Sequence, residues 1–296
     1  KGHIMGAEHA PENPSGWKRF WNRGGWRKAL LAAAVYLAFY VSLSFPISAW
    51  FGQYVDADNV LATPASIFFG LALPILIGAI VLLCFIGSLG WFREIFGRQP
   101  VAGRWWMWIA VALLVIPIGL RVAATSWSEY SVGVILTTLA TGLCIGLAEE
   151  LITRGIAVNL LRRAGHGERT VMVLSSLIFA LLHTVNAFTQ PLLNVALTVV
   201  YTFGFGVMLY LVLRVTGHII WPILVHAATD PTTFLATGGV DAAGATSGSE
   251  SLIALAGVFN FIYIAAAIVA IFLVKGKASL PSGQFGLPVN VAGRER

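Results

Sequence analysis

Long apolar runs separated by short polar segments dominate this chain. Eight of them come close to or exceed the roughly 20 residues that a helix needs to cross a bilayer. They lie at about 29–48, 65–89, 105–124, 131–161, 170–186, 191–214, 218–237 and 251–274. Transmembrane β-strands are shorter, about ten residues, and alternate in polarity. The pattern therefore predicts an all-α polytopic membrane protein with about eight transmembrane helices.

The charged residues between the runs predict how the helices are oriented. Of the 19 Lys and Arg, 17 lie in segments that share one side of the membrane if all eight runs cross it. Cytoplasmic loops carry such an excess of positive charge, so both termini are expected to be cytoplasmic. Arg121, at the outer end of the third run, departs from this pattern. The formal charge of +6 follows from this topology, and no nucleic-acid partner is expected.

Composition agrees with a membrane-embedded protein. Hydrophobic residues make up 57% of the chain and charged residues 11%, against about 25% charged residues in soluble domains. Cys84 and Cys144 lie inside apolar runs, where neither a disulfide nor a metal site is expected, and no cleavable signal peptide is evident. The predicted organisation is a tag remnant with a basic, aromatic interfacial segment (1–28), a transmembrane domain (29–274) and a cytoplasmic tail (275–296).

A few ionisable residues lie deep inside the apolar runs, where such groups are costly and usually functional. Counted from the cytoplasmic ends of their runs at about 1.5 Å per residue, the carboxylates and histidines reach depths of roughly 12 to 20 Å. Three separate helices are thus expected to bring ionisable groups to a similar depth. These residues are Glu149, Glu150 and Arg154 in the fourth run, His183 in the fifth, and His226 and Asp230 in the seventh.

The spacing within two of these runs suggests two pairs. Glu150 and Arg154 are four residues apart and share a helix face, so Arg154 can pair with Glu150 and leave Glu149 facing elsewhere. His226 and Asp230 have the same spacing, so the carboxylate can orient the imidazole. Each pair also has a simpler interpretation. Glu150 and Arg154 would suit an ion pair that locks the helix bundle, and His226 and Asp230 would suit a proton relay.

A carboxylate and a histidine around one water molecule form a hydrolytic arrangement. Glu149 can act as general base while His183 orients the water or protonates the leaving group; His183 alone would also suit an interhelical hydrogen bond. Two histidines and a glutamate are a known catalytic zinc set, here Glu149, His183 and His226. The sequence leaves open whether zinc or the bare side chains activate the water. It lacks the His-Glu-x-x-His, Gly-x-Ser-x-Gly and Gly-x-Gly-Asp motifs of other hydrolases.

Three motifs on successive runs resemble the CPBP family of intramembrane proteases. This family includes the CAAX proteases, the Abi proteins and the bacteriocin-processing peptidases, and the likeness covers about residues 131–237. The motifs are Glu149-Glu150-x-x-x-Arg154, Phe179-x-x-x-His183 and His226-x-x-x-Asp230.

The resemblance implies a fold, a reaction and roles for the first two motifs. The fold would be a helical membrane bundle with a cavity open to the cytosol, and the reaction would be that of an intramembrane endopeptidase. Glu149 and His183 would activate the water, and Glu150 and Arg154 would support the site.

The third motif departs from the family pattern. The resemblance implies that His226 and residue 230 form an oxyanion pocket, but the family often has Asn where this chain has Asp230. An anionic Asp is a poor donor to an oxyanion, so a role in orienting His226 fits it better.

The resemblance implies a reaction but no particular substrate. The expected partners are a peptide or membrane-protein segment and the lipid bilayer. The Ala- and Gly-rich composition and short loops favour a bacterial inner or plasma membrane protein. Some members of the family act without proteolysis, so the alternative is a scaffold or immunity protein that binds a partner in the same cavity. A proton-coupled transporter using Glu149 and His183 is a third class, which repeat symmetry does not support.

Overall fold

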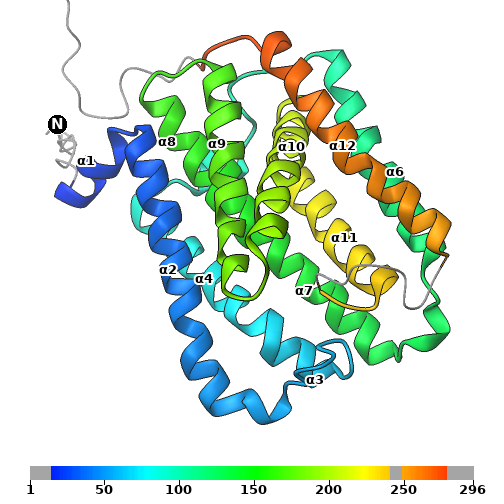
Figure 1. Ribbon diagram of the computed structural model, residues 1–296. Helices are drawn as coiled ribbons and strands as arrows, with labels where there is room; N and C mark the ends of the chain where they lie inside the picture. The colour runs from blue at the N-terminus through cyan, green and yellow to red at the C-terminus, as the bar shows by residue number, and fades with distance from the viewer. Residues whose placement is uncertain (1–14, 241–248, 279–296) are drawn as a thin grey trace, which may run out of the picture.

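The computed structural model describes residues 15–240 and 249–278, and these residues form an assembly of helices (Figure 1). The predictions for residues 1–14 and 279–296 lie outside this part of the chain. Within it, the one extended pairing is an isolated β-bridge between Gly167 and Lys277. The predicted all-α class is confirmed.

Eight long helices form the bundle over the described residues. They are α2 (Trp26–Phe51), α4 (Leu73–Leu89), α6 (Trp108–Ala124), α7 (Val132–Glu150), α9 (Glu168–Leu182), α10 (Leu192–Thr216), α11 (Ile220–Thr237) and α12 (Glu250–Leu273). The short helices are α1 (Gly16–Asn22), α3 (Pro64–Ile67), α5 (Phe92–Phe96) and α8 (Val158–Arg163). Seven helical stretches among the described residues are long and apolar enough to cross a membrane. The stretch formed by α11 is not one of them, because its 18 residues include His226, Asp230 and four threonines.

The fourth predicted span is continuous but not uniformly α-helical. A π-helical segment, Leu151–Ala157, joins α7 to α8, so that Val132–Arg163 forms one helical stretch of 32 residues. A π-helix closes its hydrogen bonds over one more residue than an α-helix, and such segments are frequent at functional sites. The irregularity begins directly after Glu150, where the sequence places the paired carboxylates.

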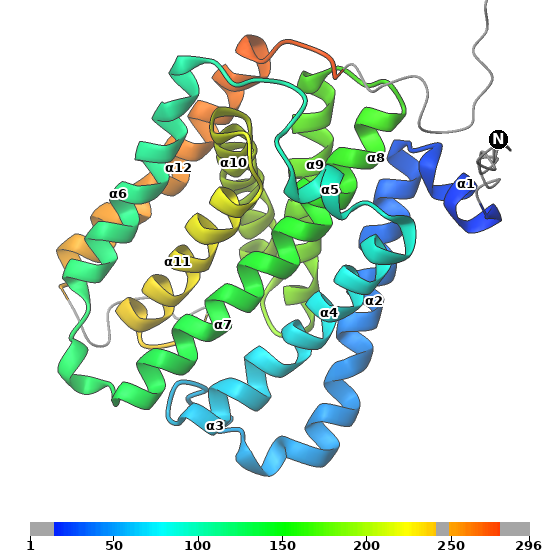
Figure 2. The same ribbon diagram turned by 180° about the vertical axis from the view of Figure 1, so that it is seen from behind.

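Helix α10 lies at the centre of the bundle and helix α2 at its edge. Helix α10 packs against α6, α9, α11 and α12 and is the most buried of the candidate spans. Helix α2 packs against α4, α8 and α9 and is the least buried of these spans. Figure 2 shows the other side of the bundle, where α6 and α12 run beside each other and α7 crosses in front of α11.

Two glycines allow α7 and α11 to pack backbone to backbone. A Cβ atom at Gly142 would lie 2.2 Å from the ring of Pro231, and one at Gly146 would lie 2.5 Å from the carbonyl oxygen of Ile223. Small residues four positions apart let transmembrane helices approach closely in this way. The contact brings the carboxyl end of α7 beside His226.

One end of the bundle carries α1, α5, α8 and the last turn of α12, and we call it the basic end because the exposed Lys and Arg of the described residues gather there. A buried cluster around Glu168 holds it together. Arg162 donates to both carboxylate oxygens of Glu168 at 2.8 and 2.7 Å, Arg214 donates at 3.2 Å, and the Tyr210 hydroxyl also donates. The Glu168 backbone N–H donates to the carbonyl oxygen of Gly276 at 2.9 Å. The ends of α8, α9 and α10 and the segment after α12 are therefore fixed to one another.

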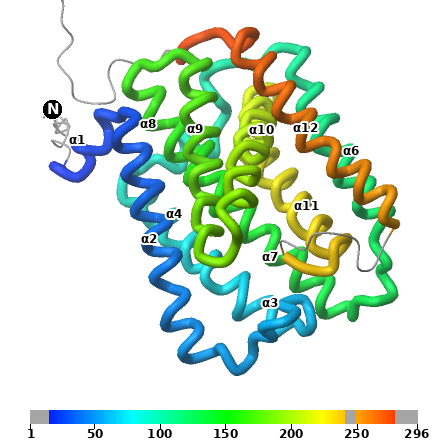
Figure 3. Tube along the Cα trace, in the orientation of Figure 1, coloured from blue at the N-terminus to red at the C-terminus, as the bar shows by residue number. Residues whose placement is uncertain are grey.

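The opposite end of the bundle is uneven. The tip of the α9–α10 hairpin, which contains the 3₁₀-helix His183–Phe188, stops well short of the lower ends of α2 and α7 in Figures 1 and 3. The long helices around the hairpin therefore extend beyond it.

Candidate active site

The two carboxylates at the end of α7 have different environments. Glu150 accepts a hydrogen bond from Arg154 at 2.9 Å, and both side chains are fully buried, at 0% exposure. This is the ion pair expected from their spacing. Glu149 makes no ion pair with Arg154, and its side chain is 26% exposed. One carboxylate is therefore enclosed in the protein, while the other faces a cavity.

Arg154 is held from three directions. Besides Glu150, it donates to the carbonyl oxygen of Gly206 in α10 at 2.6 Å, and its guanidinium lies 4.5 Å from the centre of the Phe179 ring. A Cβ atom at Gly206 would lie 3.1 Å from the Arg154 Nη2 atom, so glycine provides the room for this contact. The arginine connects the π-helical segment to α9 and α10.

His226 is oriented by Glu150. Its Nδ1 donates to Glu150 Oε1 at 3.0 Å, since an ionised carboxylate can only accept. Its Nε2 lies 3.5 Å from Asp230 Oδ2 and 4.0 Å from Glu149 Oε2. The sequence favoured Asp230 as the orienting group, and Asp230 lies beside the ring at Nε2. The structure adds Glu150 on the Nδ1 side, because the close packing of α7 on α11 brings it there.

His183 is oriented by its own helix. It is the first residue after α9, and its Nδ1 donates to the carbonyl oxygen of Phe179 at 3.0 Å. The Phe179 ring contacts both histidines, with its ring centre 5.0 Å from that of His183 and 5.6 Å from that of His226. Both imidazoles thus use Nδ1 for a hydrogen bond within the protein, and Nε2 of His226 faces Glu149 and Asp230.

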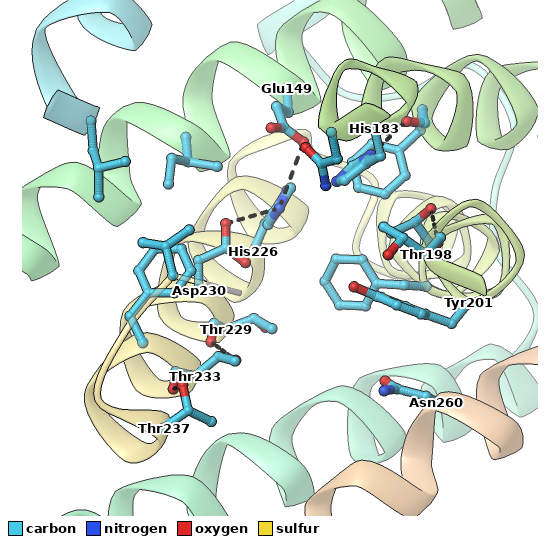
Figure 4. A pocket seen from close by; sticks show the side chains of 18 of the residues that line it. Glu149, His183, Thr198, Tyr201, His226, Thr229, Asp230, Thr233, Thr237 and Asn260 are labelled. Carbon is cyan, nitrogen blue, oxygen red and sulfur yellow. Dashed lines mark hydrogen bonds and ion pairs between the residues drawn. The ribbon is translucent and has the colours of Figure 1, made fainter. Parts of the chain in front are cut away.

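A cavity of about 470 Å³ collects these groups. Such a volume is typical of ligand sites. Glu149, His183, His226 and Asp230 lie around one part of it, and Figure 4 shows the threonines of α11 continuing along its wall. A smaller cavity of about 150 Å³ is lined by Glu149 and His183 together with residues of α2 and α4. Glu149 and His183 therefore line both cavities.

The main cavity lies toward the end of the bundle opposite the basic end. Its lining includes Arg121 in the last turn of α6, Gln190 in the α9–α10 turn and Thr237 at the end of α11. Toward the basic end it is closed by Phe179 and Arg154, which are 1% exposed, and beyond them by the Glu168 cluster. The sequence predicts cytoplasmic basic segments, and the family resemblance implies a cavity open to the cytosol. In this fold the two expectations favour opposite orientations of the cavity in the membrane.

The described residues do not assemble a metal site. No three His, Cys, Asp or Glu side chains in residues 15–240 and 249–278 are placed to share a metal ion. The zinc set considered from the sequence, Glu149, His183 and His226, is not among such groups. In this arrangement the three side chains do not fit one zinc ion.

Comparison with protein families identifies the segment that carries these residues. Residues 131–232 match the family model of the type II CAAX prenyl endopeptidase Rce1-like proteins. This segment is similar to an Rce1-like domain. No curated protein and no solved structure matches the chain in the parallel comparisons. The match agrees with the CPBP resemblance of the sequence motifs.

The segment that matches the family model is only part of the bundle. It runs from the residue before α7 into α11, and so contains all six predicted site residues. Helices α2, α4, α6 and α12 lie outside it, yet they supply Tyr40, Ile75, Arg121 and Tyr263 to the cavity wall. The match thus covers the predicted site residues, and helices outside it complete the wall of the main cavity.

Sequence reasoning missed several residues that position the site. Gly142 and Gly146 have a recognisable signal, since glycines four apart in an apolar helix are a known packing motif. Gly206 and Tyr40 have none, because only the three-dimensional packing shows that they contact the site or line the cavity.

Proposed function

We propose that this protein is an intramembrane endopeptidase that hydrolyses peptide bonds with a water molecule activated by Glu149 and His183. The proposal depends chiefly on one arrangement. A partly exposed carboxylate and two imidazole Nε2 atoms share one cavity, and a buried ion pair supports them from behind. An ion pair serving only to hold the bundle together would not need these groups around an enclosed space.

These side chains suffice to complete the reaction. A water between Glu149 and His183 gives a proton to Glu149 while its oxygen attacks the carbonyl carbon of the substrate. The carbonyl oxygen becomes an oxyanion, which accepts a hydrogen bond from Nε2 of the doubly protonated His226. The C–N bond then breaks, and Glu149 passes its proton to the leaving nitrogen. One water is consumed, and an acid and an amine are formed.

Removal of the base provides the direct test. We expect Glu149→Gln to lower cleavage of a peptide pool by about 10²- to 10⁴-fold, the usual contribution of general base catalysis, and His183→Ala to have a large effect of the same kind. Purified protein in nanodiscs would be assayed by mass spectrometry, with and without a chelator. Glu129→Gln is the matched control, since Glu129 is exposed and lies outside both cavities.

The outcomes separate this proposal from the scaffold alternative. Unchanged cleavage by a folded Glu149→Gln protein would refute the catalytic role. A folded wild type that cleaves no peptide, together with a Glu149→Gln variant that keeps the cellular phenotype, would favour a scaffold that binds its partner in the cavity. Loss of cleavage with chelator alone would show that a metal takes part.

We also propose that substrate reaches the site from the extracytoplasmic side. The excess of Lys and Arg supports a cytoplasmic basic end, and the cavity lies at the other end of the bundle. The buried Arg154 and Glu168 layers separate the reacting groups from the basic end. This replaces the cytosolic access that the sequence resemblance implied.

A further inference from the structure

Arg121 is a cation in the cavity wall that the proposed reaction does not use. It lies in the last turn of α6 and lines the main cavity with Glu149 and His226. Among the described residues that line either cavity, it is the one Lys or Arg. It also departs from the charge pattern of the chain. It lies at the outer end of its run, whereas 17 of the 19 Lys and Arg lie in the predicted cytoplasmic segments.

The Arg121 side chain has donors to spare. Its Nη1 atom is buried and has no hydrogen-bond partner, and the arginine forms no ion pair with an acidic group of the described residues. Asp230 lies within electrostatic range but does not approach to ion-pair distance. A guanidinium carries five N–H donors, and leaving such a charge buried without a partner is unfavourable.

The chemistry of a suitable ligand follows from this arrangement. A guanidinium binds a carboxylate through two parallel hydrogen bonds, which gives both affinity and a fixed orientation. The lining of the cavity also offers neutral polar groups, among them Asn260 and Tyr263 of α12 and Thr233 of α11. A peptide in this cavity would therefore meet one strong anion-binding group away from the peptide bond attacked by the water that Glu149 activates.

We propose that Arg121 binds a carboxylate of the substrate peptide and so sets the distance between that carboxylate and the cleaved bond. The proposal rests on the peptidase function proposed above. The carboxylate is either the peptide C-terminus or an Asp or Glu side chain, since both present the same group to the guanidinium. In either case Arg121 is a specificity residue, and it takes no part in the proton transfers.

The test compares synthetic peptide pools that differ only in their carboxylates. One pool has free C-terminal acids, a second has C-terminal amides, and each is made with and without Asp and Glu. Mass spectrometry gives the rate and position of cleavage by the wild type, Arg121→Gln and Arg121→Lys. The matched control is Arg93→Gln, which removes an exposed arginine at the basic end.

We expect the wild type to cut carboxylate-bearing peptides at least about tenfold faster than neutral ones, a ratio in the range of one charge-assisted contact. The cuts should lie a fixed number of residues from the carboxylate. Arg121→Gln should bring the ratio close to one through a higher KM, Arg121→Lys should keep part of it, and Arg93→Gln should keep it all. A response to the C-terminal amide identifies the terminus as the ligand, and a response to Asp and Glu alone identifies the side chain.

A wild-type ratio near one, or an unchanged ratio in a folded Arg121→Gln protein, would overturn the proposal. A measurement of peptide binding distinguishes failure of the Arg121 proposal from failure of the proposed peptidase function. If no peptide is cleaved, the affinity of Glu149→Gln protein for the acid and amide pools is measured with and without Arg121→Gln. Tighter binding of the acid pool that depends on Arg121 retains the subsite, and equal binding removes it.

Discussion

Glu149 and Glu150 are neighbours in the chain with opposite surroundings. The buried Glu150 accepts from both Arg154 and His226 through one oxygen, while Glu149 faces the cavity. Successive residues of a helix point about 100° apart, so adjacent carboxylates can serve two purposes. Glu150 holds Arg154 and His226 in place, and Glu149 is open to the cavity.

Glu150→Gln should therefore act on stability as well as on activity. It leaves the Arg154 guanidinium buried without its counterion, a change that destabilises proteins by about 3–5 kcal/mol. The thermal midpoint of the purified protein should fall well below that of Glu149→Gln, whose side chain is partly exposed. Equal midpoints for the two variants would argue that Glu150 does not support the fold in this way.

At the scale of elements, the contact between α7 and α11 determines the geometry of the site. Gly142→Ala places a methyl group 2.2 Å from Pro231, so the helices must separate. We expect a loss of about 1–3 kcal/mol, the usual effect of overpacking, together with lower cleavage because His226 moves away from the carboxylates. Thermal unfolding and the peptide assay would measure both effects.

A control for this variant exists in the same bundle. A Cβ atom added at Gly119 of α6 would enter open space, with nothing within 4 Å. Gly119→Ala should be neutral or slightly stabilising, because alanine favours helices. If Gly142→Ala behaved like Gly119→Ala, the close approach of α7 and α11 would not be needed for the site.

The long helices were more predictable from the sequence than the segments that join them and the contacts between them. Apolar runs locate the long helices because each must satisfy its own backbone in the bilayer, and the spacing of Glu150 and Arg154 predicts their ion pair. The π-helical segment after Glu150 was not predicted. It depends on how several helices pack, which leaves no local pattern. The contact of His226 with Glu150 was also not predicted, because spacing along one helix is visible in a sequence, whereas a contact between helices is not.

At the scale of the whole molecule, the orientation in the membrane decides where substrate comes from. In a background with Cys84→Ala and Cys144→Ala, a single cysteine at Gln190 probes the cavity end and one at Arg98 probes the basic end. An impermeant maleimide added to intact cells should label Gln190→Cys, and Arg98→Cys should react only after lysis. The reverse pattern would place the cavity on the cytosolic side, as the sequence resemblance implied.

The buried layer between the cavity and the basic end also bears on the products of the proposed reaction. Phe179, Arg154 and the Glu168 cluster make up this layer. Under the proposed peptidase function, both fragments would leave through the openings by which the substrate arrived. Cleavage would then release a peptide on one side of the bilayer without carrying a fragment across.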